Sequence, residues 1–324
     1  MARALVVTRH GGTEVLEVQD RTAGSPARGQ VLVRPVASGV NFIEVYQREG
    51  IYNTSPPFVL GAEGAGTVEE VGPDVADVAV GDTVAWTAMP GSHADLVVGP
   101  ADALVPVPAG VSAEVAAAVM LQGLTAHYLV HSTFPVREGQ TALVHAAAGG
   151  VGQLLVQMIA EHGATVIGTA STEAKAAKAR SLGAAEVIRY DQVPDLAAAV
   201  RAANGGRGVE VVYDGVGRST FDASLASLAR RGMLVLFGAA SGPVPPVDPQ
   251  RLNSGGSLFL TRPTLGDYTA TREELLWRAG EVLNAVADGS LQVEIGGRYS
   301  LVDAARAYQD LEGRRSTGKL LLTR

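Results

Sequence analysis

A glycine-rich turn between an apolar strand and an amphipathic helix constrains this chain more than any other feature. The run Ala146-Ala147-Ala148-Gly149-Gly150-Val151-Gly152 follows the apolar segment 141–145 and opens the segment 150–162. Within 150–162 the apolar residues recur at i, i+3, i+4, i+7 and i+8, which predicts one buried face of a helix that stops at Gly163. The run therefore predicts a strand–turn–helix unit.

The turn fits the pattern G-x-G-x-x-G with alanine in the first place. In such a unit, small residues let backbone N–H groups and the positive end of the helix approach a pyrophosphate closely. A merely tight turn would explain Gly152 but not the small residues before it. We therefore predict a dinucleotide site whose pyrophosphate is bound by Gly149, Gly150, Val151 and Gly152.

The segment from about residue 124 to 260 alternates short apolar runs with helix-like stretches. Strands are predicted at 141–145, 165–169, 186–188, 209–213 and 233–237, each bounded by Gly or Asp. Such alternation is typical of βαβ units whose strands are covered on both faces. We expect an α/β domain with a Rossmann-type, doubly wound parallel sheet.

The remainder of the chain is rich in predicted strands. Residues 1–120 hold short runs at 4–8, 30–35, 66–71 and 83–88, separated by Gly, Pro and Asp, with no long helical period. The tail has two helical stretches, 271–288 and 301–312, and a final strand at 319–322. We expect residues 1–122 to fold with 264–324 as a β-rich domain, into which the α/β domain 123–263 is inserted.

The end of the second predicted strand bears on which dinucleotide is bound. NAD enzymes place an acidic residue there to hold the ribose hydroxyls, but this chain has Ala170, and Glu173 is expected in the first turn of the next helix. A hydroxyl, an ammonium and a phenol from Ser171, Lys175 and Tyr190 would instead suit a 2′-phosphate. We expect NADPH rather than NADH, while noting that a lone lysine on a helix is commonly just solvated.

Composition excludes several classes of site. There is no cysteine, so disulfides, thiolate metal sites and cysteine nucleophiles are excluded. The net charge is −7 and no basic run exceeds two residues, which disfavours nucleic acid as a partner. No apolar stretch reaches the roughly 18 residues that span a bilayer, and residues 4–7 are too few for a signal sequence. We expect a cytoplasmic protein with no membrane partner.

Several motifs together carry a family resemblance over essentially the whole chain. They are Gly39-Val40-Asn41-Phe42-Ile43, Gly61-Ala62-Glu63-Gly64-Ala65-Gly66, Gly123-Leu124-Thr125, the run from His145 to Gly152, Val212-Tyr213-Asp214-Gly215-Val216-Gly217 and Phe259-Leu260-Thr261-Arg262-Pro263. With them the chain resembles the zinc-independent quinone oxidoreductases, the zeta-crystallin group of the medium-chain dehydrogenase/reductase superfamily. The resemblance implies a GroES-like catalytic domain around the Rossmann domain, NADPH as cofactor, and commonly a homodimer.

The resemblance also implies that no zinc is bound. Zinc-dependent relatives have Gly-His-Glu where this chain has Gly61-Ala62-Glu63, and a ligand cysteine where it has Asn41. The six histidines show no ligand spacing such as H-E-x-x-H. Hydride delivery to a quinone needs less Lewis-acid help than alcohol oxidation, because the anion that forms is spread over a ring. We expect no metal site.

Site residues follow from the resemblance and from the predicted strand ends. The resemblance implies that Asn41, Tyr46, Tyr52 and Thr125 line the catalytic cleft, with Asn41 as a neutral donor in the vacated metal position and Glu63 as a structural partner. Asn41 as a simple turn residue and the tyrosines as half-buried packing are the alternatives. Beyond the pyrophosphate and 2′-phosphate contacts already named, the expected cofactor residues are Phe237, Gly238, Ser241, Phe259, Leu260, Thr261 and, at the phosphate end from the tail, Lys319.

The leading hypothesis is NADPH-dependent reduction of quinones. Reduction of α,β-unsaturated carbonyls uses the same hydride and a similarly flat substrate, so the sequence leaves the quinone and enone hypotheses open. A crystallin-like or RNA-binding protein with a reductase fold is a hypothesis of another class, and a reductase module detached from a larger synthase is a third. The run 256–261 is apolar enough to be either the edge strand of a dimer or a buried internal strand.

Overall fold

The chain folds as two units, one discontinuous and one continuous. The computed structural model describes residues 2–313 and 315–324. Unit 1 comprises residues 1–124 and 271–324, and unit 2 comprises residues 125–270. The two boundaries thus fall at 124 and 270 rather than at the expected 122 and 263, so residues 264–270 belong to the inserted unit.

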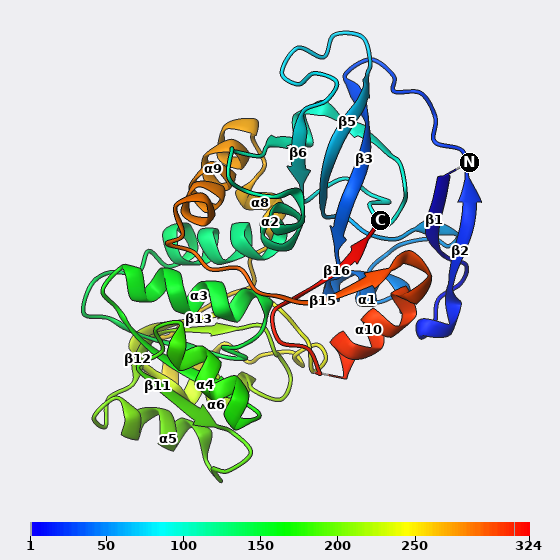
Figure 1. The fold of residues 1–324 in the computed structure, drawn as a ribbon. Coiled ribbons are helices and arrows are strands. Elements are labelled where there is room, and N and C mark those ends of the chain that lie inside the picture. The colour runs from blue at the N-terminus through cyan, green and yellow to red at the C-terminus, as the bar shows by residue number, and fades with distance from the viewer. Residues whose placement is uncertain (1, 314) are drawn as a thin grey trace. The chain divides into compact units, whose positions relative to one another are not determined.

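Unit 2 is built on a parallel sheet (Figure 1). Its six strands follow the order β11-β10-β9-β12-β13-β14. The order reverses between β11 and β12, which is the doubly wound topology expected from the sequence, and helices before and after the reversal cover opposite faces. The strands are β9 (Thr141–Val144), β10 (Thr165–Ala170), β11 (Glu186–Arg189), β12 (Val209–Asp214), β13 (Leu228–Leu236) and β14 (Phe259–Thr261). The helices are η3 (Leu129–Thr133, a π-helical turn), α3 (Gly150–Glu161), α4 (Glu173–Ser181), α5 (Leu196–Ala203), α6 (Phe221–Ser227), α7 (Gln250–Ser254) and α8 (Leu265–Tyr268).

The core of unit 2 consists of the strand side chains and the apolar faces of the helices. Leu143, Ile167, Val212 and Leu234 from four neighbouring strands are at most 1% exposed and belong to one cluster. This explains why the strands read as continuous apolar runs, since both faces of each strand are covered. β14 is the last strand on its side of the sheet and Phe259 is 55% exposed, so this segment is an edge strand of the sheet rather than a buried internal strand.

Unit 1 contains a seven-stranded and a three-stranded sheet. β3 pairs with β5, β7 and β16 in antiparallel fashion, so the C-terminal strand joins the N-terminal sheet as expected. The strands are β1 (Ala2–Val7), β2 (Leu16–Arg21), β3 (Gln30–Gly39), β4 (Phe58–Val59), β5 (Gly64–Val71), β6 (Thr83–Trp86), β7 (Val97–Pro100), β8 (Val105–Pro106), β15 (Ile295–Ser300) and β16 (Lys319–Thr323). The helices are η1 (Thr13–Val15), α1 (Phe42–Arg48), η2 (Ala101–Ala103), α2 (Ala113–Tyr128, which crosses the unit boundary), α9 (Arg272–Asp288), η4 (Leu301–Asp303) and α10 (Ala304–Glu312).

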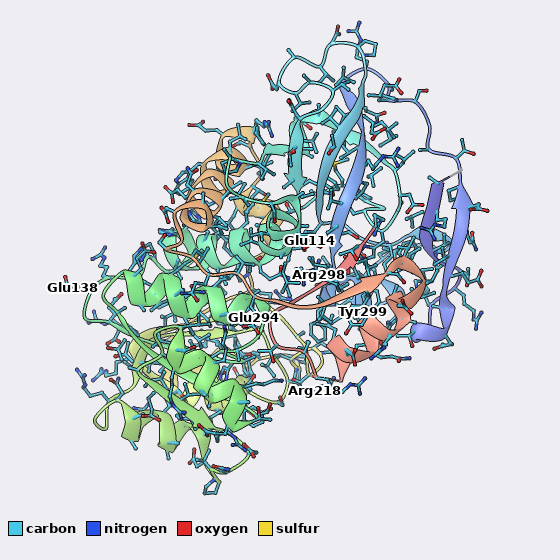
Figure 2. All side chains as sticks on the ribbon, viewed as in Figure 1. Glu114, Glu138, Arg218, Glu294, Arg298 and Tyr299 are labelled. Atoms are coloured by element: carbon cyan, nitrogen blue, oxygen red, sulfur yellow. The ribbon has the colours of Figure 1, made fainter. Side chains whose placement is uncertain are left out.

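Two helices of the N-terminal segment depart from the expectation that it has no helical period. α2 begins at Ala113, and α1 follows directly on Asn41. On the side of unit 1 that carries the tail, Arg298 of β15 and Glu114 of α2 form an ion pair with N–O distance 3.0 Å (Figure 2). Both side chains are partly exposed, so the pair adds at most about 1 kcal/mol of stability.

One helical stretch among the described residues, Ala113–Thr133, is long and apolar enough by length and composition to cross a membrane. In its most apolar window 78% of the residues are buried within the protein. Core helices of globular proteins pass the same test, so the stretch is weak evidence for a membrane span.

Candidate functional site

Most of the expected cofactor residues belong to loops, strands or first helix turns at one edge of the six-stranded sheet, and Lys319, which lies in unit 1, is the exception. All strands of this sheet are parallel, so their carboxyl ends meet at the same edge, which is where such sheets bind ligands. The glycine-rich turn follows β9, Ser171 follows β10 and Tyr190 follows β11. The loop that begins at Phe237 follows β13, and β14 itself is Phe259–Thr261.

The glycine-rich turn is shaped by close backbone approaches. Ala146 has φ +50°, and its carbonyl accepts the N–H of Gly149 at 2.8 Å. A Cβ on Gly152 would overlap that same carbonyl oxygen and lie 2.9 Å from Cα of Ala147, so only glycine fits there. Helix α3 begins at Gly150 behind Gly149, whose lack of a side chain leaves the first N–H groups of the helix uncapped. These N–H groups suit an anion.

A buried histidine lies directly behind the turn. The ring nitrogens of His145 are 3.1 Å from Oγ1 of Thr169 and 2.9 Å from Oγ of Ser224, and Ser224 donates to Asp214 at 2.7 Å. Thr169 Oγ1 also accepts the N–H of Ala146 at 3.2 Å, so the network supports the start of the turn. Complete burial lowers the pKa of His145, and the Asp214 carboxylate only partly opposes this. The imidazole is therefore neutral in the folded protein.

This histidine makes stability depend on pH. Its pKa in the folded protein lies below the ordinary value of 6.5. As the pH falls below 6.5, this histidine therefore binds a proton in the unfolded chain before it does so in the folded chain. The stabilisation is complete above pH 6.5 and is lost as pH falls below it. We expect urea unfolding at pH 7.5, 6.5 and 5.5 to show a steeper loss of stability for the unsubstituted protein than for His145→Asn. Equal slopes for the two proteins would contradict the assignment.

The acidic residue that follows β10 forms ion pairs with two arginines. α4 begins at Glu173, as expected, and its carboxylate lies 2.8 Å from Arg180 and 3.9 Å from Arg189. Ser171 and Lys175 are half-buried, while Tyr190 is 40% exposed and its N–H lies 3.4 Å from the carbonyl oxygen of Ala170. The ends of β10 and β11 thus lie beside each other, and the carboxylates that follow them, Glu173 and Asp191, face arginines.

The loop after β13 packs against the turn after β12. Ser241 donates its hydroxyl to the carbonyl of Val216 at 2.8 Å and accepts the N–H of Ser219 at 3.0 Å. A Cβ on Gly238 would lie 2.5 Å from the carbonyl oxygen of Gly215. The hydroxyl of Ser241 is therefore used within the protein, and this residue would reach a cofactor through its backbone rather than through its hydroxyl.

In unit 1 a buried ammonium lies at the centre of a polar cluster. Nζ of Lys319 is 2.5 Å from Oε2 of Glu63, 2.7 Å from Oδ1 of Asn41 and 2.7 Å from Oε1 of Gln122. The side chains of Lys319 and Glu63 are 4% and 0% exposed. Oε1 of Glu63 accepts the N–H of Leu121 at 2.6 Å, which fits the structural role expected for this carboxylate. We call Asn41, Glu63, Gln122 and Lys319 the ammonium cluster.

The position of Lys319 differs from the sequence-based expectation. A lysine near the end of the chain was expected to reach the phosphate end of the cofactor, but its ammonium has three acceptors within unit 1. Breaking a buried pair of this kind costs about 3–5 kcal/mol. Lys319 is therefore part of the ammonium cluster rather than a phosphate ligand.

Asn41 also differs in its chemistry from what was expected. Nδ2 donates to the carbonyl of Gly39 and to Glu63, both at 3.0 Å, and Oδ1 accepts from Lys319 and from Gln122, the latter at 2.6 Å. The opposite orientation of the amide would bring NH₂ against the ammonium, so the charges decide it. Both protons of the amide are used, and Asn41 has none left for a substrate.

A second buried network fixes the backbone of Asn41. Glu44, three residues on, accepts the N–H of Asn41 at 2.7 Å and the hydroxyl of Tyr308 at 2.6 Å. That hydroxyl also lies 2.9 Å from His93, whose other ring nitrogen is 2.8 Å from Ser38. Burial alone would raise the pKa of Glu44, but His93, Tyr308 and the N–H of Asn41 outweigh it and leave the pKa lowered. The carboxylate is thus held in its charged form.

The two expected tyrosines do lie together. Tyr46 of α1 and Tyr52 have ring centroids 5.6 Å apart in an edge-to-face arrangement, and the N–H groups of residues 51 and 52 lie 2.9 and 3.3 Å from the carbonyl oxygen of Tyr46. Tyr52 is 41% exposed and its neighbour Ile51 is 55% exposed, so the pair offers an accessible aromatic surface. Thr125 is 8% exposed and lies on α2, in the part that belongs to unit 2.

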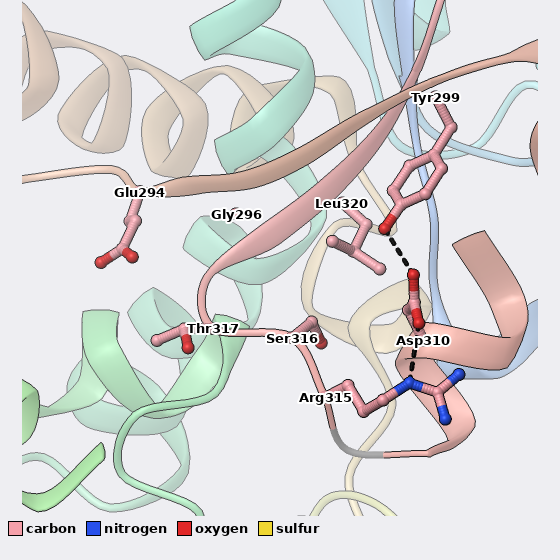
Figure 3. A pocket seen from close by; sticks show the side chains of 8 residues that line it. All are labelled: Glu294, Gly296, Tyr299, Asp310, Arg315, Ser316, Thr317 and Leu320. Carbon is pink, nitrogen blue, oxygen red and sulfur yellow. Dashed lines mark hydrogen bonds and ion pairs between the residues drawn. The ribbon is translucent and has the colours of Figure 1, made fainter. Parts of the chain in front are cut away.

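A hollow of about 340 Å³ lies in unit 1 beside the segment that leads into β16 (Figure 3). Its arginine, Arg315, is paired with Asp310 at 2.8 Å, and Asp310 also accepts the hydroxyl of Tyr299 at 2.7 Å. These two contacts lower the pKa of Asp310, the tyrosine contributing most. The lining residues are Glu294, Gly296, Tyr299, Asp310, Arg315, Ser316, Thr317 and Leu320.

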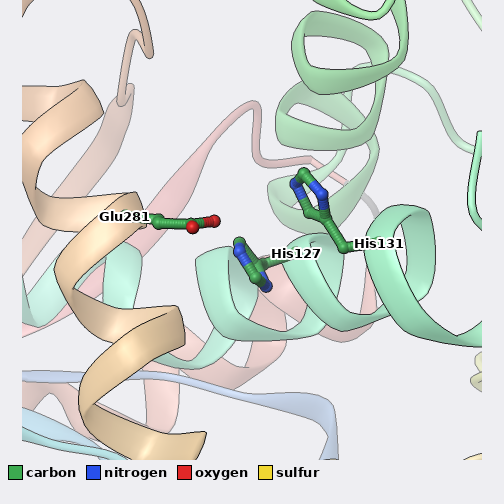
Figure 4. Close-up of side chains that lie close together, drawn as sticks. All are labelled: His127, His131 and Glu281. Atoms are coloured by element: carbon green, nitrogen blue, oxygen red, sulfur yellow. The ribbon is translucent and has the colours of Figure 1, made fainter.

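Three of the six histidines lie together in unit 2, which the sequence analysis did not anticipate. His127 and His131 are four residues apart on consecutive helical turns, with ring centroids 4.2 Å apart (Figure 4). The ring of His131 is also 4.9 Å from that of His162. Periodicity alone could have shown that positions 127 and 131 share a helix face.

Gln122 is a further residue that the sequence analysis missed. It lies 81 positions from Asn41 in the sequence, and only folding brings the start of α1 and α2 together so that the two amides meet. No local motif marks it.

Comparison with known proteins gives matches over the whole chain. The family model described as "Alcohol dehydrogenase GroES-like domain" matches residues 27–133, and the model described as "Zinc-binding dehydrogenase" matches residues 150–275. Together they cover more than half of the chain.

Individual relatives match along nearly their full length. A quinone oxidoreductase of Pseudomonas aeruginosa is 44% identical, with 99% of each chain covered. A 2-haloacrylate reductase of a Burkholderia species is 40% identical, again with 99% of each chain covered. The solved structure of mycobacterial Rv1454c complexed with NADPH is 50% identical, covers 99% of this chain and 100% of its own, and superposes with a TM-score of 0.97.

Proposed function

Because this chain belongs to the quinone oxidoreductase family of the medium-chain dehydrogenase/reductase superfamily, we propose that it reduces quinones with NADPH and without a metal. The chain is an oxidoreductase, and its Rossmann-type and GroES-like parts are those of the family. The observation that carries the proposal is the carboxyl edge of the six-stranded sheet, where a turn closed by Gly152 follows β9 and where Ser171 and Tyr190 follow the strands β10 and β11.

NADPH rather than NADH is favoured by the charges at this edge. Glu173 is paired with Arg180 and Arg189, and Ala170 has no polar side chain, so the strand end that carries an acid in NAD enzymes carries none here. When bound, NADPH supplies a hydride from C4 of its nicotinamide to the acceptor, whose oxygen takes a proton from water, leaving NADP⁺ and the reduced acceptor. The uncapped N–H groups at the start of α3 would hold the pyrophosphate.

Absence of a catalytic zinc is supported by what surrounds Asn41. The ammonium of Lys319 already occupies the centre of the cluster formed by Asn41, Glu63 and Gln122. Zinc prefers thiolate and imidazole ligands, whereas this cluster offers two amide oxygens and one carboxylate. We propose that Tyr46 and Tyr52 supply the aromatic face for a flat substrate, and that Thr125 is a further residue that acts in catalysis.

A decisive experiment compares substrates and cofactors in one series. Steady-state rates would be measured with a naphthoquinone and with an alkenal, each with NADPH and with NADH. We expect the naphthoquinone with NADPH to be fastest. Turnover of the alkenal alone would favour the second candidate, an enone reductase, which the similarity to a 2-haloacrylate reductase supports. No turnover of either substrate would refute both.

Lys175→Ala should weaken NADPH binding while leaving NADH binding nearly unchanged. Losing one charge-assisted contact to a phosphate costs about 1.5–3 kcal/mol, which is roughly 10- to 150-fold in the dissociation constant. Fluorescence titration with each cofactor measures the two constants. Lys178→Ala, three residues along α4, is the matched control. Equal losses for NADPH and NADH in Lys175→Ala would remove this residue from the 2′-phosphate site.

The proposal also covers where the protein lies in the cell and how its copies assemble. We propose a cytoplasmic protein that forms a homodimer through β14, whose outer edge has no partner strand among the described residues. A role in binding RNA is disfavoured by the net charge of −7.

A further inference from the structure

The amide of Gln122 keeps one N–H group without an acceptor among the described residues. Its nitrogen donates to Oδ1 of Asn41 at 2.6 Å, and its oxygen accepts from the ammonium of Lys319 at 2.7 Å. A primary amide carries two protons on nitrogen, so one proton remains. The side chain is half-buried rather than enclosed.

Every other donor of the ammonium cluster is used. The three protons of Lys319 face Glu63, Asn41 and Gln122, and both amide protons of Asn41 are taken by Gly39 and Glu63. The side chain of Glu63 accepts only. The cluster therefore has one hydrogen-bond donor to offer to a bound molecule, and it belongs to Gln122.

The charge of Lys319 fixes the direction of that donor and strengthens it. Rotating the amide of Gln122 by half a turn would place its NH₂ group against the ammonium and its oxygen against Oδ1 of Asn41, which is also an acceptor. An amide whose oxygen accepts a bond from a cation is polarised, and its N–H groups become better donors. The ammonium is itself held by the buried carboxylate of Glu63 at 2.5 Å.

We propose that Gln122 donates its remaining N–H to the substrate oxygen that gains negative charge as the hydride arrives, and that Lys319 orients and polarises this amide. In this assignment Gln122 is the catalytic residue and Lys319 a positioning residue. The inference rests on the proposed reduction of a quinone or enone. Removing one donor to a developing oxyanion commonly lowers kcat by about 10²- to 10³-fold. Because the charge is delocalised over a quinone ring, we expect a loss of about 10²-fold here.

The test is a set of variants assayed for quinone reduction and for NADPH binding. Gln122→Leu should lower kcat and kcat/KM by about 10²-fold while the NADPH dissociation constant stays within twofold, because the donor acts on the substrate in the transition state. Gln309→Leu makes the same change at an exposed position of α10 and should retain the full rate. A rate for Gln122→Leu within twofold of the unsubstituted protein would overturn the inference.

The role of Lys319 is tested through non-additivity. Since Lys319→Met alone would leave Glu63 as a buried, unpaired carboxylate and could prevent folding, the variant is Glu63→Gln combined with Lys319→Met. We expect this pair to slow quinone reduction, and adding Gln122→Leu to it should slow the reaction no further than Gln122→Leu alone does. Losses that multiply in the triple variant would show that Lys319 does not act through Gln122.

The outcomes separate the two levels of the proposal. If the unsubstituted protein reduces neither quinone nor enone, the proposed function fails and the inference fails with it. If the unsubstituted protein turns over normally and Gln122→Leu does too, only the inference fails.

Discussion

Gly152→Ala is expected to abolish measurable binding of NADPH and NADH alike. The added Cβ would overlap the carbonyl oxygen of Ala146 and lie 2.9 Å from Cα of Ala147 and 3.0 Å from the carbonyl carbon of Ala146. All three atoms belong to the backbone, so a change of side-chain rotamer cannot relieve the overlap. The turn can relieve the overlap only by moving as a unit.

That movement would displace the groups that bind the pyrophosphate. Ala146 already has φ +50°, a left-handed conformation that non-glycine residues seldom adopt, and its carbonyl holds Gly149 in place at 2.8 Å. Pushing this carbonyl away separates the turn from the start of α3, where the uncapped N–H groups lie. Because NADPH and NADH share the pyrophosphate, we expect losses of at least about 10²-fold for both, unlike the selective loss in Lys175→Ala.

Fluorescence titration with both cofactors measures the effect, and Gly266→Ala is the control. Gly266 lies in the same unit, and a Cβ there would meet no atom within 4 Å. We expect that control to bind both cofactors normally. Normal binding by Gly152→Ala would mean that the turn is not where the pyrophosphate lies.

The parallel sheet was predictable because each of its central strands is an apolar run with a turn residue at both ends. Burial on both faces removes the alternation that obscures other strands, so β9 and β12 match the expectation to within one residue. β13 begins five residues earlier than expected, at Leu228, since the exposed Arg230 and Arg231 interrupt its apolar pattern. The local pattern of apolar residues therefore predicts the bounds of a strand where the apolar run is uninterrupted.

For other elements the sequence pattern was weaker, or it was present but not recognised. α1 was missed, although Asn41 followed by Glu44 has the spacing of a capping box, and the Glu44 half of that box is formed. β15 was missed because its two consecutive glycines, Gly296 and Gly297, disfavour a strand by propensity. It forms nonetheless, since pairing with β16 overrides that preference.

The ammonium cluster could not be predicted from local sequence at all. Lys319 and Glu63 are 256 positions apart, and Lys319 opens a run of three leucines that indicates only a strand. A lysine in that context is expected at the surface, because burying it without a partner is costly. The partners come from the turn between β3 and α1, from α2 and from the segment before β5, which only the folded chain brings together.

Asp214 presents the opposite case, since the partners of its side chain lie within ten residues of it along the chain. Its Oδ1 accepts the N–H groups of Val216 and Gly217 at 2.8 and 3.0 Å, and its two oxygens accept the hydroxyls of Thr220 and Ser224 at 2.7–2.9 Å. The residue is 0% exposed. One carboxylate thus closes the turn after β12 and, through Ser224, supports His145 behind the glycine-rich turn.

We expect Asp214→Ala to destabilise unit 2 by about 3 kcal/mol or more, because it leaves several buried donors without an acceptor. Loss of the contact through Ser224 would also loosen His145, so NADPH binding should weaken even in the fraction that remains folded. Asp214→Asn keeps one acceptor oxygen and the shape of the side chain, so its loss of stability should be clearly smaller. Urea unfolding combined with NADPH titration measures both effects. Equal stability of Asp214→Ala and the unsubstituted protein would show that the network behind the turn contributes nothing to holding it.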